Sequence, residues 1–364
     1  MATIDRRLMA RALQLANRGL MTVSPNPAVG CVLAKDGEIV GEGWHIRAGG
    51  SHAEIHALQA AGDRAKGATA YVTLEPCSHH GKTPPCTDAL IEAGVSRVVF
   101  GMQDCNPAVS GSGLNRLREA GIVVEGPLLE SEARRLNRGF IKRHTQGLPW
   151  VTVKLAMSLD GRTAMASGES QWITGPEARS DVQRFRAASC AIITGINTVL
   201  RDNTRLTVRK EQLGLEYPLP DIRQPLRVVL DSQGRLNSES TLLEEAGPIL
   251  QVVASGEIAP LKGAEQLRLP GGQGVDLPGL LQNLAARQCN QVLVEAGPTL
   301  AGALVQAGLV DELVIYMAPV LLGSHARPLL ELPLERMDQK VQLKIVDSRT
   351  VGADIRITAS PILR

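Results

Sequence analysis

Residues 70–86 have the sequence AYVTLEPCSHHGKTPPC, and the short motif His52-Ala53-Glu54 precedes them in the chain. One imidazole and two thiols, from His52, Cys77 and Cys86, form a set of three potential metal ligands. Such a set is typical of a catalytic zinc site, in which the fourth position is open to water. Zinc lowers the pKa of that water to roughly 7, so hydroxide is present at neutral pH. We therefore predict zinc bound by these three residues.

Glu54 is the candidate proton shuttle of this site. It lies two residues from His52, so its carboxylate can take the proton of the bound water and pass it to a departing amine without being a ligand. The order His-x-Glu and then Pro-Cys is the signature of zinc nucleobase deaminases. His52 opens a predicted helix over residues 52–61, and Cys77 follows a predicted strand that ends at Leu74. Sites in open α/β sheets gather at the carboxyl ends of strands, which supports this placement.

Other interpretations of the motif are less well supported. A metalloprotease has His-Glu-x-x-His, which differs from the spacing in residues 52–56. A closed structural zinc site would need a fourth ligand, for which His56, His79 and His80 are candidates. A non-catalytic zinc module would have no use for Glu54 beside its ligands. A nucleoside or tRNA deaminase fused to an unrelated domain is the alternative enzyme.

Composition limits the classes of function. A length of 364 residues predicts two domains. Three each of Trp, Tyr and Phe, with a net charge of +2, supply neither stacking platforms nor a basic surface, so no nucleic-acid partner is expected. No stretch approaches the ~20 apolar residues of a membrane span, and residues 1–11 lack the apolar core of a signal peptide. Six scattered cysteines do not form a disulfide scaffold. We expect a cytoplasmic protein with no membrane contact.

Strand and helix signals alternate in the first half of the chain. Asp36-Gly37 is a strong hairpin signal between two short apolar runs. The predicted helices are 5–16, 52–61, 87–93, 114–120 and much of 130–146. The predicted strands are 31–34, 38–41, 68–74, 95–101 and 122–126. This pattern predicts an α/β sandwich with helices over a largely parallel sheet.

A domain boundary is expected at residues 147/148, where Gly147 and Pro149 follow a charged helical stretch. A second α/β series begins at Trp150. Its predicted strands are 151–157, 191–195, 226–231, 249–254, 291–295 and 312–317, and its predicted helices are 176–187, 278–286 and 299–307. Residues 209–224 and 262–277 are expected to be loops. The first strand lacks a following Gly-x-Gly-x-x-Gly, so a Rossmann nucleotide site is not supported.

Three clusters in the second half are candidates for binding. They are residues 154–162, where a strand runs into a polar turn, residues 170–176, and residues 294–300, where a strand, a turn of small residues and a helix start follow one another. Free N–H groups at the start of a helix bind anions readily, which suits a nucleotide phosphate. A buried charge such as Lys154 or Glu295 at a sheet position needs a partner or a function.

The chain resembles the bifunctional deaminase/reductase of bacterial riboflavin biosynthesis. The resemblance covers essentially the full chain and includes Pro25-Asn26-Pro27, residues 29–32, the whole of residues 70–86 with its long Pro-Cys-x8-Cys loop, and Asn106-Pro107. It departs at Cys105 and at Asn203 and Thr204, where other residues are expected.

The resemblance implies a fold, two cofactors and two reactions. Residues 1–147 would be a cytidine-deaminase-like three-layer α/β domain that deaminates a 2,5-diamino-6-ribosylamino-pyrimidinone 5′-phosphate with zinc. Residues 148–364 would be a dihydrofolate-reductase-like α/β domain that uses NADPH to reduce the ribosyl group to ribityl. The family also implies a homo-oligomer, a dimer through its reductase domains.

The resemblance further implies the residues that contact each ligand. The NADPH contacts would be Ala156, Trp172, Thr198, Asp202, Ser232, Gly297, Pro298, Thr299, Leu300, Ala301, Gly302 and Ala303. The contacts to the pyrimidine substrate would be Asn26, His79 and Lys82 in the first domain, and Lys154, Ser170, Arg186, Leu206, Arg209 and Glu295 in the second. Arg186 and Arg209 suit a sugar phosphate, because guanidinium binds phosphate in a bidentate manner.

Overall fold

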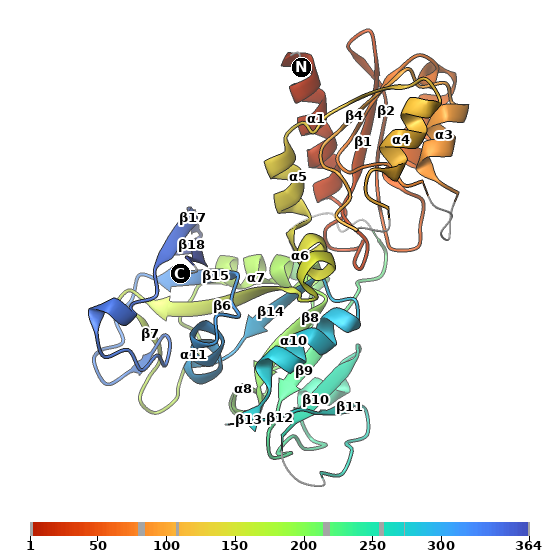
Figure 1. The fold of residues 1–364 in the computed structure, drawn as a ribbon. Coiled ribbons are helices and arrows are strands. Elements are labelled where there is room, and N and C mark those ends of the chain that lie inside the picture. The colour runs from red at the N-terminus through yellow and green to blue at the C-terminus, as the bar shows by residue number, and fades with distance from the viewer. Residues whose placement is uncertain are drawn as a thin grey trace. The chain divides into compact units, whose positions relative to one another are not determined.

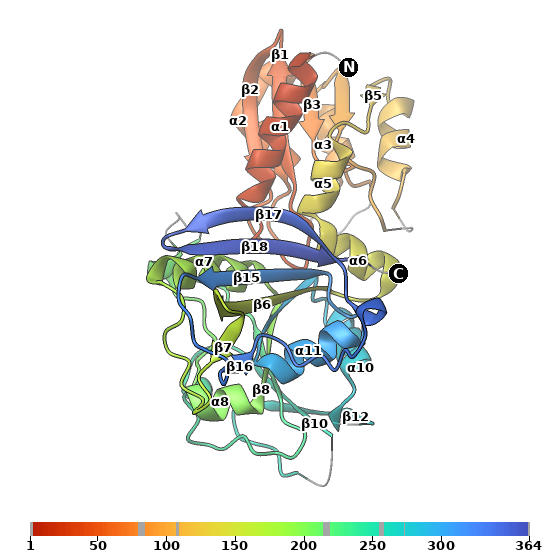
Figure 2. The same ribbon diagram turned by 90° about the vertical axis from the view of Figure 1, so that its left-hand side faces the viewer.

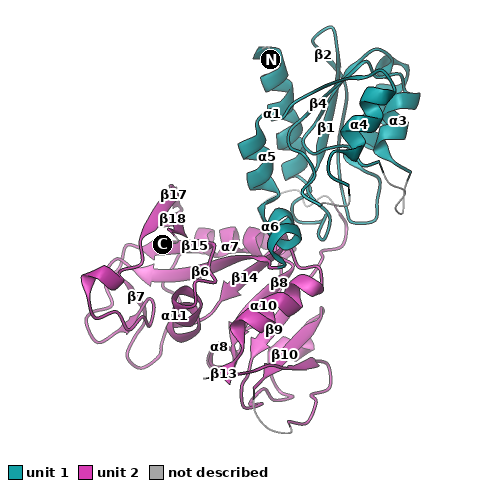
Figure 3. Cartoon of the chain, in the orientation of Figure 1, with its two compact units in different colours: residues 1–147 teal, residues 148–364 magenta. Residues whose placement is uncertain are grey.

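A computed structural model describes residues 3–78, 84–106, 109–213, 219–254, 258–272 and 274–362 of the chain. The chain divides into two compact units, residues 1–147 and 148–364 (Figure 3). Among the described residues, no helix has both the length and the apolar character that crossing a membrane requires.

The first unit, coloured from red to yellow in Figure 1, is built on a five-stranded sheet whose strand order is β2-β1-β3-β4-β5. Its elements are α1 (Thr3–Asn17), β1 (Gly30–Lys35), β2 (Glu38–Trp44), α2 (Ala53–Ala61), the 3-10 helix η1 (Gly62–Ala65), β3 (Thr69–Val72), α3 (Cys86–Glu92), β4 (Arg97–Phe100), α4 (Ser112–Glu119), β5 (Val123–Glu125), α5 (Glu130–Leu136) and α6 (Arg138–Gln146). The predicted hairpin is confirmed: β1 and β2 pair antiparallel across Asp36 and Gly37, which have φ values of 51° and 84°. Such positive values favour Asp-Gly in a two-residue turn.

Helices cover both faces of this sheet, which gives three layers. Leu8, Ala12 and Leu15 of α1 pack with one face, while α2, α3 and α4 pack with the other through residues such as Ala57 and Leu90. The sheet is less parallel than expected: β3, β4 and β5 run parallel, but β1 pairs antiparallel with both β2 and β3. The two-residue turn makes β1 antiparallel to β2, and β1 lies between β2 and β3, which run in the same direction, so it is antiparallel to both.

The second unit contains a nine-stranded sheet of order β11-β10-β9-β8-β14-β6-β15-β18-β17. Its strands are β6 (Trp150–Ser158), β7 (Arg162–Ala164), β8 (Ala191–Gly195), β9 (Leu226–Leu230), β10 (Ile249–Val253), β11 (Glu265–Arg268), β12 (Pro270–Gly271), β13 (Gly274–Val275), β14 (Gln291–Glu295), β15 (Glu312–Ala318), β16 (Arg327–Pro328), β17 (Leu343–Val351) and β18 (Asp354–Pro361). Its helices are α7 (Pro176–Ala188), α8 (Ile196–Asp202), α9 (Thr241–Glu244), α10 (Leu277–Ala286) and α11 (Pro298–Gln306), with 3-10 turns η2 (Lys210–Gln212) and η3 (Met337–Gln339).

In the order of the sheet, the strands from β11 through β15 run parallel to one another. Strand β18 pairs antiparallel with β15, and β17 pairs antiparallel with β18 (Figure 2). Helices α10 and α11 cover one face through Leu281 and Leu304, whereas α7, α8 and α9 contribute to the clusters on the other. The expectation of an irregular segment over residues 262–277 is wrong in part, because β11 extends the sheet there and β12 and β13 form a small hairpin.

Candidate functional site

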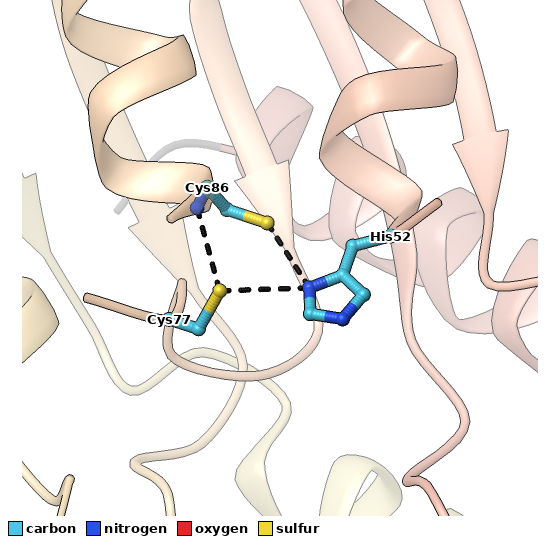
Figure 4. Close-up of side chains that lie close together, drawn as sticks. All are labelled: His52, Cys77 and Cys86. Atoms are coloured by element: carbon cyan, nitrogen blue, oxygen red, sulfur yellow. Dashed lines mark hydrogen bonds between the residues drawn. The ribbon is translucent and has the colours of Figure 1, made fainter. Parts of the chain in front are cut away.

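Three predicted ligands converge in the first unit, although 34 residues separate the first from the last. His52 caps the start of α2, Cys86 is the first residue of α3, and Cys77 lies in the segment after β3. The Nδ1 atom of His52 lies 3.2 Å from Sγ of Cys86 and 3.5 Å from Sγ of Cys77 (Figure 4). All three ligand atoms lie within 4.8 Å of one another.

This donor set fits zinc. A tetrahedral ion with Zn–S of about 2.3 Å and Zn–N of about 2.0 Å places its nitrogen and sulfur ligands roughly 3.6 Å apart, close to the separations found. The backbone N–H of Cys86 also donates to Sγ of Cys77 over 3.3 Å. Hydrogen bonds from Cys86 and His52 hold the pKa of the Cys77 thiol well below its usual range, so this sulfur is readily the thiolate that a metal requires.

Glu54 lies in the first turn of α2, next to these ligands, with only 3% of its surface exposed. Burial, together with the negative charge of Cys77, raises the pKa of Glu54 to about 7. A carboxyl group with such a pKa can both accept and release a proton near neutral pH, which is what a shuttle has to do. The structure therefore gives Glu54 the surroundings of a general acid and base.

His45 is a neighbour of this cluster that the sequence motifs did not reveal. It is 2% exposed, and its ring meets that of His52 edge to face with centroids 5.4 Å apart. Its Nδ1 lies 3.0 Å from the carbonyl oxygen of Ser51, and its Nε2 lies 3.0 Å from Nδ2 of the predicted substrate contact Asn26. Burial lowers the pKa of His45. A lone histidine at the end of a strand carries no signal in sequence, because its partners come from distant segments.

Two buried side chains fix the loops beside the zinc cluster. The carboxylate of Glu75 accepts backbone N–H groups from Asp104, Gly111 and Gly113, at 2.9–3.2 Å. The amide of Asn137 exchanges two hydrogen bonds with the backbone of Ala28, at 2.8 and 3.0 Å. Asn137 thus anchors the segment that carries Asn26. The other substrate contacts predicted for this unit, His79 and Lys82, lie outside the described residues.

The second unit contains a cleft of about 1810 Å³. Pockets for single small molecules usually measure about 300–1,000 Å³, so this cleft has room for two ligands at once. Of the contacts predicted for this unit, the following line it: Lys154, Ala156, Ser170, Trp172, Arg186, Thr198, Asp202, Leu206, Arg209, Ser232, Glu295, Gly297, Pro298, Thr299, Leu300 and Ala303. They come from segments spread over about 150 residues of sequence.

Two predicted cofactor contacts do not line the cleft. Ala301 is fully buried in the apolar cluster beneath α11. Gly302 faces the backbone of Glu331, where an added Cβ would lie 2.1 Å from the carbonyl oxygen. Both positions lie on the inner side of a helix whose first residues border the cleft, and the helical period turns them away from it.

Charged side chains gather at the β6–β14 side of the cleft. Arg186 of α7 binds Glu295 through two hydrogen bonds of 2.6 and 3.0 Å. Lys154 stands opposite Glu295 in the parallel register of β6 and β14. Burial lowers the pKa of Lys154, while the negative charge of Glu295 opposes that shift. Near the same cleft, the guanidinium of Arg179 stacks 4.6 Å from the ring of Trp172, which is 69% exposed.

Comparison with known proteins assigns the chain to a family. Residues 149–357, more than half of the chain, match the family model described as RibD C-terminal domain. The chain belongs to the RibD family. Residues 2–102 match a second model, the zinc-binding region of cytidine and deoxycytidylate deaminases. Both matches confirm the expected α/β fold class.

Several RibD proteins resemble the chain over nearly its whole length. The riboflavin biosynthesis protein RibD of Escherichia coli K12 is 55% identical, over 96% of this chain and 98% of its own, and that of Haemophilus influenzae is 51% identical, over 97% and 96%. A solved structure of Acinetobacter baumannii RibD superposes with a TM-score of 0.90 at 44% identity, covering 99% of each chain.

A structure from Thermotoga maritima, described as a diaminohydroxyphosphoribosylaminopyrimidine deaminase/5-amino-6-(5-phosphoribosylamino)uracil reductase, gives a TM-score of 0.88 at 34% identity and covers 99% of each chain. The chain is thus a bifunctional RibD-type enzyme of riboflavin biosynthesis, with a zinc-binding deaminase region and an NADPH-dependent reductase region.

Proposed function

We propose that residues 1–147 deaminate a 2,5-diamino-6-ribosylamino-pyrimidinone 5′-phosphate and that residues 148–364 then reduce its ribosyl group to ribityl. The convergence of His52, Cys77 and Cys86 beside the buried Glu54 supports this division most strongly. A single phosphorylated intermediate connects the two reactions, which accounts for their presence in one chain.

In the first reaction, His52, Cys77 and Cys86 hold the metal and Glu54 moves the protons. When bound, zinc supplies a Lewis acid that makes water nucleophilic at neutral pH. Glu54 accepts a proton from the attacking water and delivers it to the leaving amine. The water oxygen bonds to the ring carbon, the exocyclic C–N bond breaks, and ammonia departs. Asn26, and His79 and Lys82 of the loop between the cysteines, bind the pyrimidine and its phosphate.

In the second reaction, side chains of the cleft position the sugar and bind its phosphate. When bound, NADPH supplies the hydride for the ribose C1′, which is held as its open-chain imine. Lys154 and Glu295 orient the ribose hydroxyls and assist protonation of the nitrogen, since these two partly buried charged residues stand opposite each other on β6 and β14. Arg186 and Arg209, with Ser170 and Leu206, bind the sugar phosphate.

The NADPH contacts proposed for the cleft come from several elements. They are Ala156, Trp172, Thr198, Asp202, Ser232, the first residues of α11 from Gly297 to Leu300, and Ala303.

We also propose that two copies of the chain associate through their reductase regions, in the cytoplasm. Strand β17 lies at the end of the nine-stranded sheet and exposes Leu343, Ile345 and Val346 at 41%, 65% and 52%. An exposed apolar edge strand is a template for pairing with another chain. Light scattering should give twice the mass of one chain, and Ile345→Lys should give a monomer. A wild-type monomer would contradict the proposal.

The central experiment follows both products in one sample. Purified protein and the pyrimidine ribosyl phosphate should release ammonia, and a zinc chelator should stop that release. Added NADPH should then be oxidised, as seen in its absorbance. Ammonia without oxidation would contradict the assignment of residues 148–364. Ammonia released from cytidine or RNA, but not from this substrate, would contradict the substrate.

A further inference from the structure

The turn after β9 carries the positively charged side chain of Arg235 at the far side of the reductase cleft. Ser232, Gln233 and Arg235 of this turn all line the cleft, as do Lys154 and Glu295 at its charged side. In the order of the sheet, β8 separates β9 from β14. Neighbouring strands are about 4.8 Å apart, so the turn lies roughly 10 Å from the end of β14 along the sheet edge.

A dinucleotide placed in this cleft must run along that edge. With its nicotinamide near Lys154 and Glu295, where the sugar is reduced, the pyrophosphate passes the start of α11, and the adenosine half reaches the turn after β9. This placement rests on the proposed function of the cleft. The 2′-phosphate that distinguishes NADPH from NADH belongs to the adenosine half, so its partner is expected at this turn.

The backbone of the turn is held rigidly from below. Asp231 is completely buried, and its carboxylate accepts the N–H groups of Arg235 and Leu236, each at 2.8 Å, and the side-chain amide of Gln251 at 2.9 Å. Gly234 has a φ of 70° and donates to the carbonyl oxygen of Asp231. Arg235 therefore starts from a fixed backbone position, which lowers the entropy lost when its side chain binds a ligand.

The side chain of Arg235 is also oriented. Its Nη2 donates to Oδ1 of Asn197 over 3.0 Å, and Asn197, in the first turn of α8, lines the same cleft. An amide holds a guanidinium in place without neutralising it. The remaining N–H groups of Arg235 can bind a phosphate dianion in a bidentate, charge-assisted manner.

Three of the other arginines that line the cleft face a carboxylate. Arg186 is paired with Glu295 at 2.6 Å, and Arg205 with Glu245 at 3.0 Å. Arg201 lies next to Asp202 in the chain and interacts with that carboxylate. Arg235 differs from these three arginines, because the side chain that orients it is the amide of Asn197 and not a carboxylate.

We propose that Arg235 binds the 2′-phosphate of NADPH and makes the reductase prefer NADPH to NADH. Ser232, at the start of the same turn, contributes a hydroxyl on that side. Arg235 is a specificity-determining residue: it contacts the cofactor far from the carbon that is reduced.

Equilibrium binding tests the proposal without turnover. The change in nicotinamide fluorescence gives Kd for NADPH and for NADH, with the full zinc-loaded chain and no pyrimidine present. A charge-assisted contact is worth about 10–100-fold in affinity. Arg235→Ala should weaken NADPH binding by that factor and leave NADH binding unchanged, and Arg235→Lys should restore part of the difference.

Arg201→Ala is the matched control, because it removes another arginine of the same cleft. It should keep the preference for NADPH. Every variant should release ammonia at the wild-type rate, which shows that the first unit is folded, and unchanged NADH binding shows that the second unit is folded. The proposal is overturned if Arg235→Ala keeps the preference, if it weakens NADH equally, or if Arg201→Ala loses the preference instead. A wild-type chain that binds neither nucleotide would overturn the cofactor site as well.

Discussion

The two sites of this enzyme differ in how the chain builds them. The zinc cluster uses residues within a stretch of 35 positions, and two of the three ligands lie at the starts of α2 and α3. The reductase cleft draws on β6, α7, β8, β9, β14 and α11, over more than 140 positions. One site is fixed by a few local turns, and the other exists only once a whole sheet has formed.

This difference has a physical origin. A metal needs ligands at short, fixed distances, which a few side chains at helix starts can supply. A dinucleotide and a sugar phosphate need a long surface, and the edge of a parallel sheet offers one. The first site should therefore be sensitive to single substitutions, whereas the second should lose function in smaller steps.

The largest effect is expected for Glu54→Gln. Removing a general acid and base costs about 10²–10⁴-fold in rate, so ammonia release should fall by about that factor while the zinc content stays the same. NADPH oxidation with deaminated substrate should not change. The exposed Glu92→Gln is the control. A fall in both activities would break the division between the two sites.

Cys86→Ser should remove zinc and ammonia release together. A hydroxyl is a poor replacement for a thiolate ligand of zinc. Metal analysis should show less than one zinc per chain, and NADPH oxidation of deaminated substrate should continue. Cys105→Ser, which changes a cysteine outside the cluster, should keep both. Full zinc occupancy in Cys86→Ser would contradict its role as a ligand.

Lys154→Met should lower NADPH oxidation by roughly 100-fold, the usual loss when one preorganised electrostatic contact is removed. Burial lowers the pKa of Lys154. Its cationic form is present below that pKa and lost above it, so the wild-type reductase should lose activity with rising pH before an ordinary lysine titrates, near 10.4.

The pH profile of NADPH oxidation checks this directly. Glu295→Gln should move the alkaline loss to lower pH, because Glu295 stabilises the charged lysine. The exposed Lys262→Met is the control for Lys154→Met. A profile that is flat up to pH 10 would show that Lys154 does not act as a cation.

Asn137→Ala should have the smallest effect, and that effect is expected on the stability of the first unit. It removes two hydrogen bonds to the backbone of Ala28 in a buried setting, worth about 2 kcal/mol in the free energy of unfolding. Urea denaturation followed in the first unit measures it. Asn115→Ala, on the exposed face of α4, should change stability by less than about 0.5 kcal/mol. If Asn137→Ala lowers the free energy of unfolding no more than Asn115→Ala does, the contacts with Ala28 do not contribute to stability.

Local signals were enough for much of the fold. The Asp36-Gly37 turn predicted a hairpin because only residues that tolerate positive φ fit such a turn. Strands β8 and β14 begin and end where the apolar runs do, since both faces of these strands are buried. The ligand set could be proposed for the same reason: its motifs are short and its spacing is local.

Other elements lacked such signals. Strand β17 was not predicted, because it is exposed along nearly its whole length and has no buried face to impose alternation. Helix α8 has seven residues and no capping side chain. His45 and Asn137 could not be identified as neighbours of the site, because their partners lie at least six and as many as 109 positions away and only folding brings them close.

The hydrogen bonds of His45 also decide how Asn26 meets a ligand. The carbonyl oxygen of Ser51 can only accept, so Nδ1 of His45 carries the proton, and in the neutral ring Nε2 must accept. The amide of Asn26 therefore turns its NH₂ group to His45 and offers its oxygen elsewhere. Burial lowers the pKa of His45, which favours the neutral imidazole, so we expect Asn26, the proposed pyrimidine contact, to favour ligands that donate hydrogen, such as an aromatic amine, over those that only accept. A charged His45 would reverse that choice without any change in sequence.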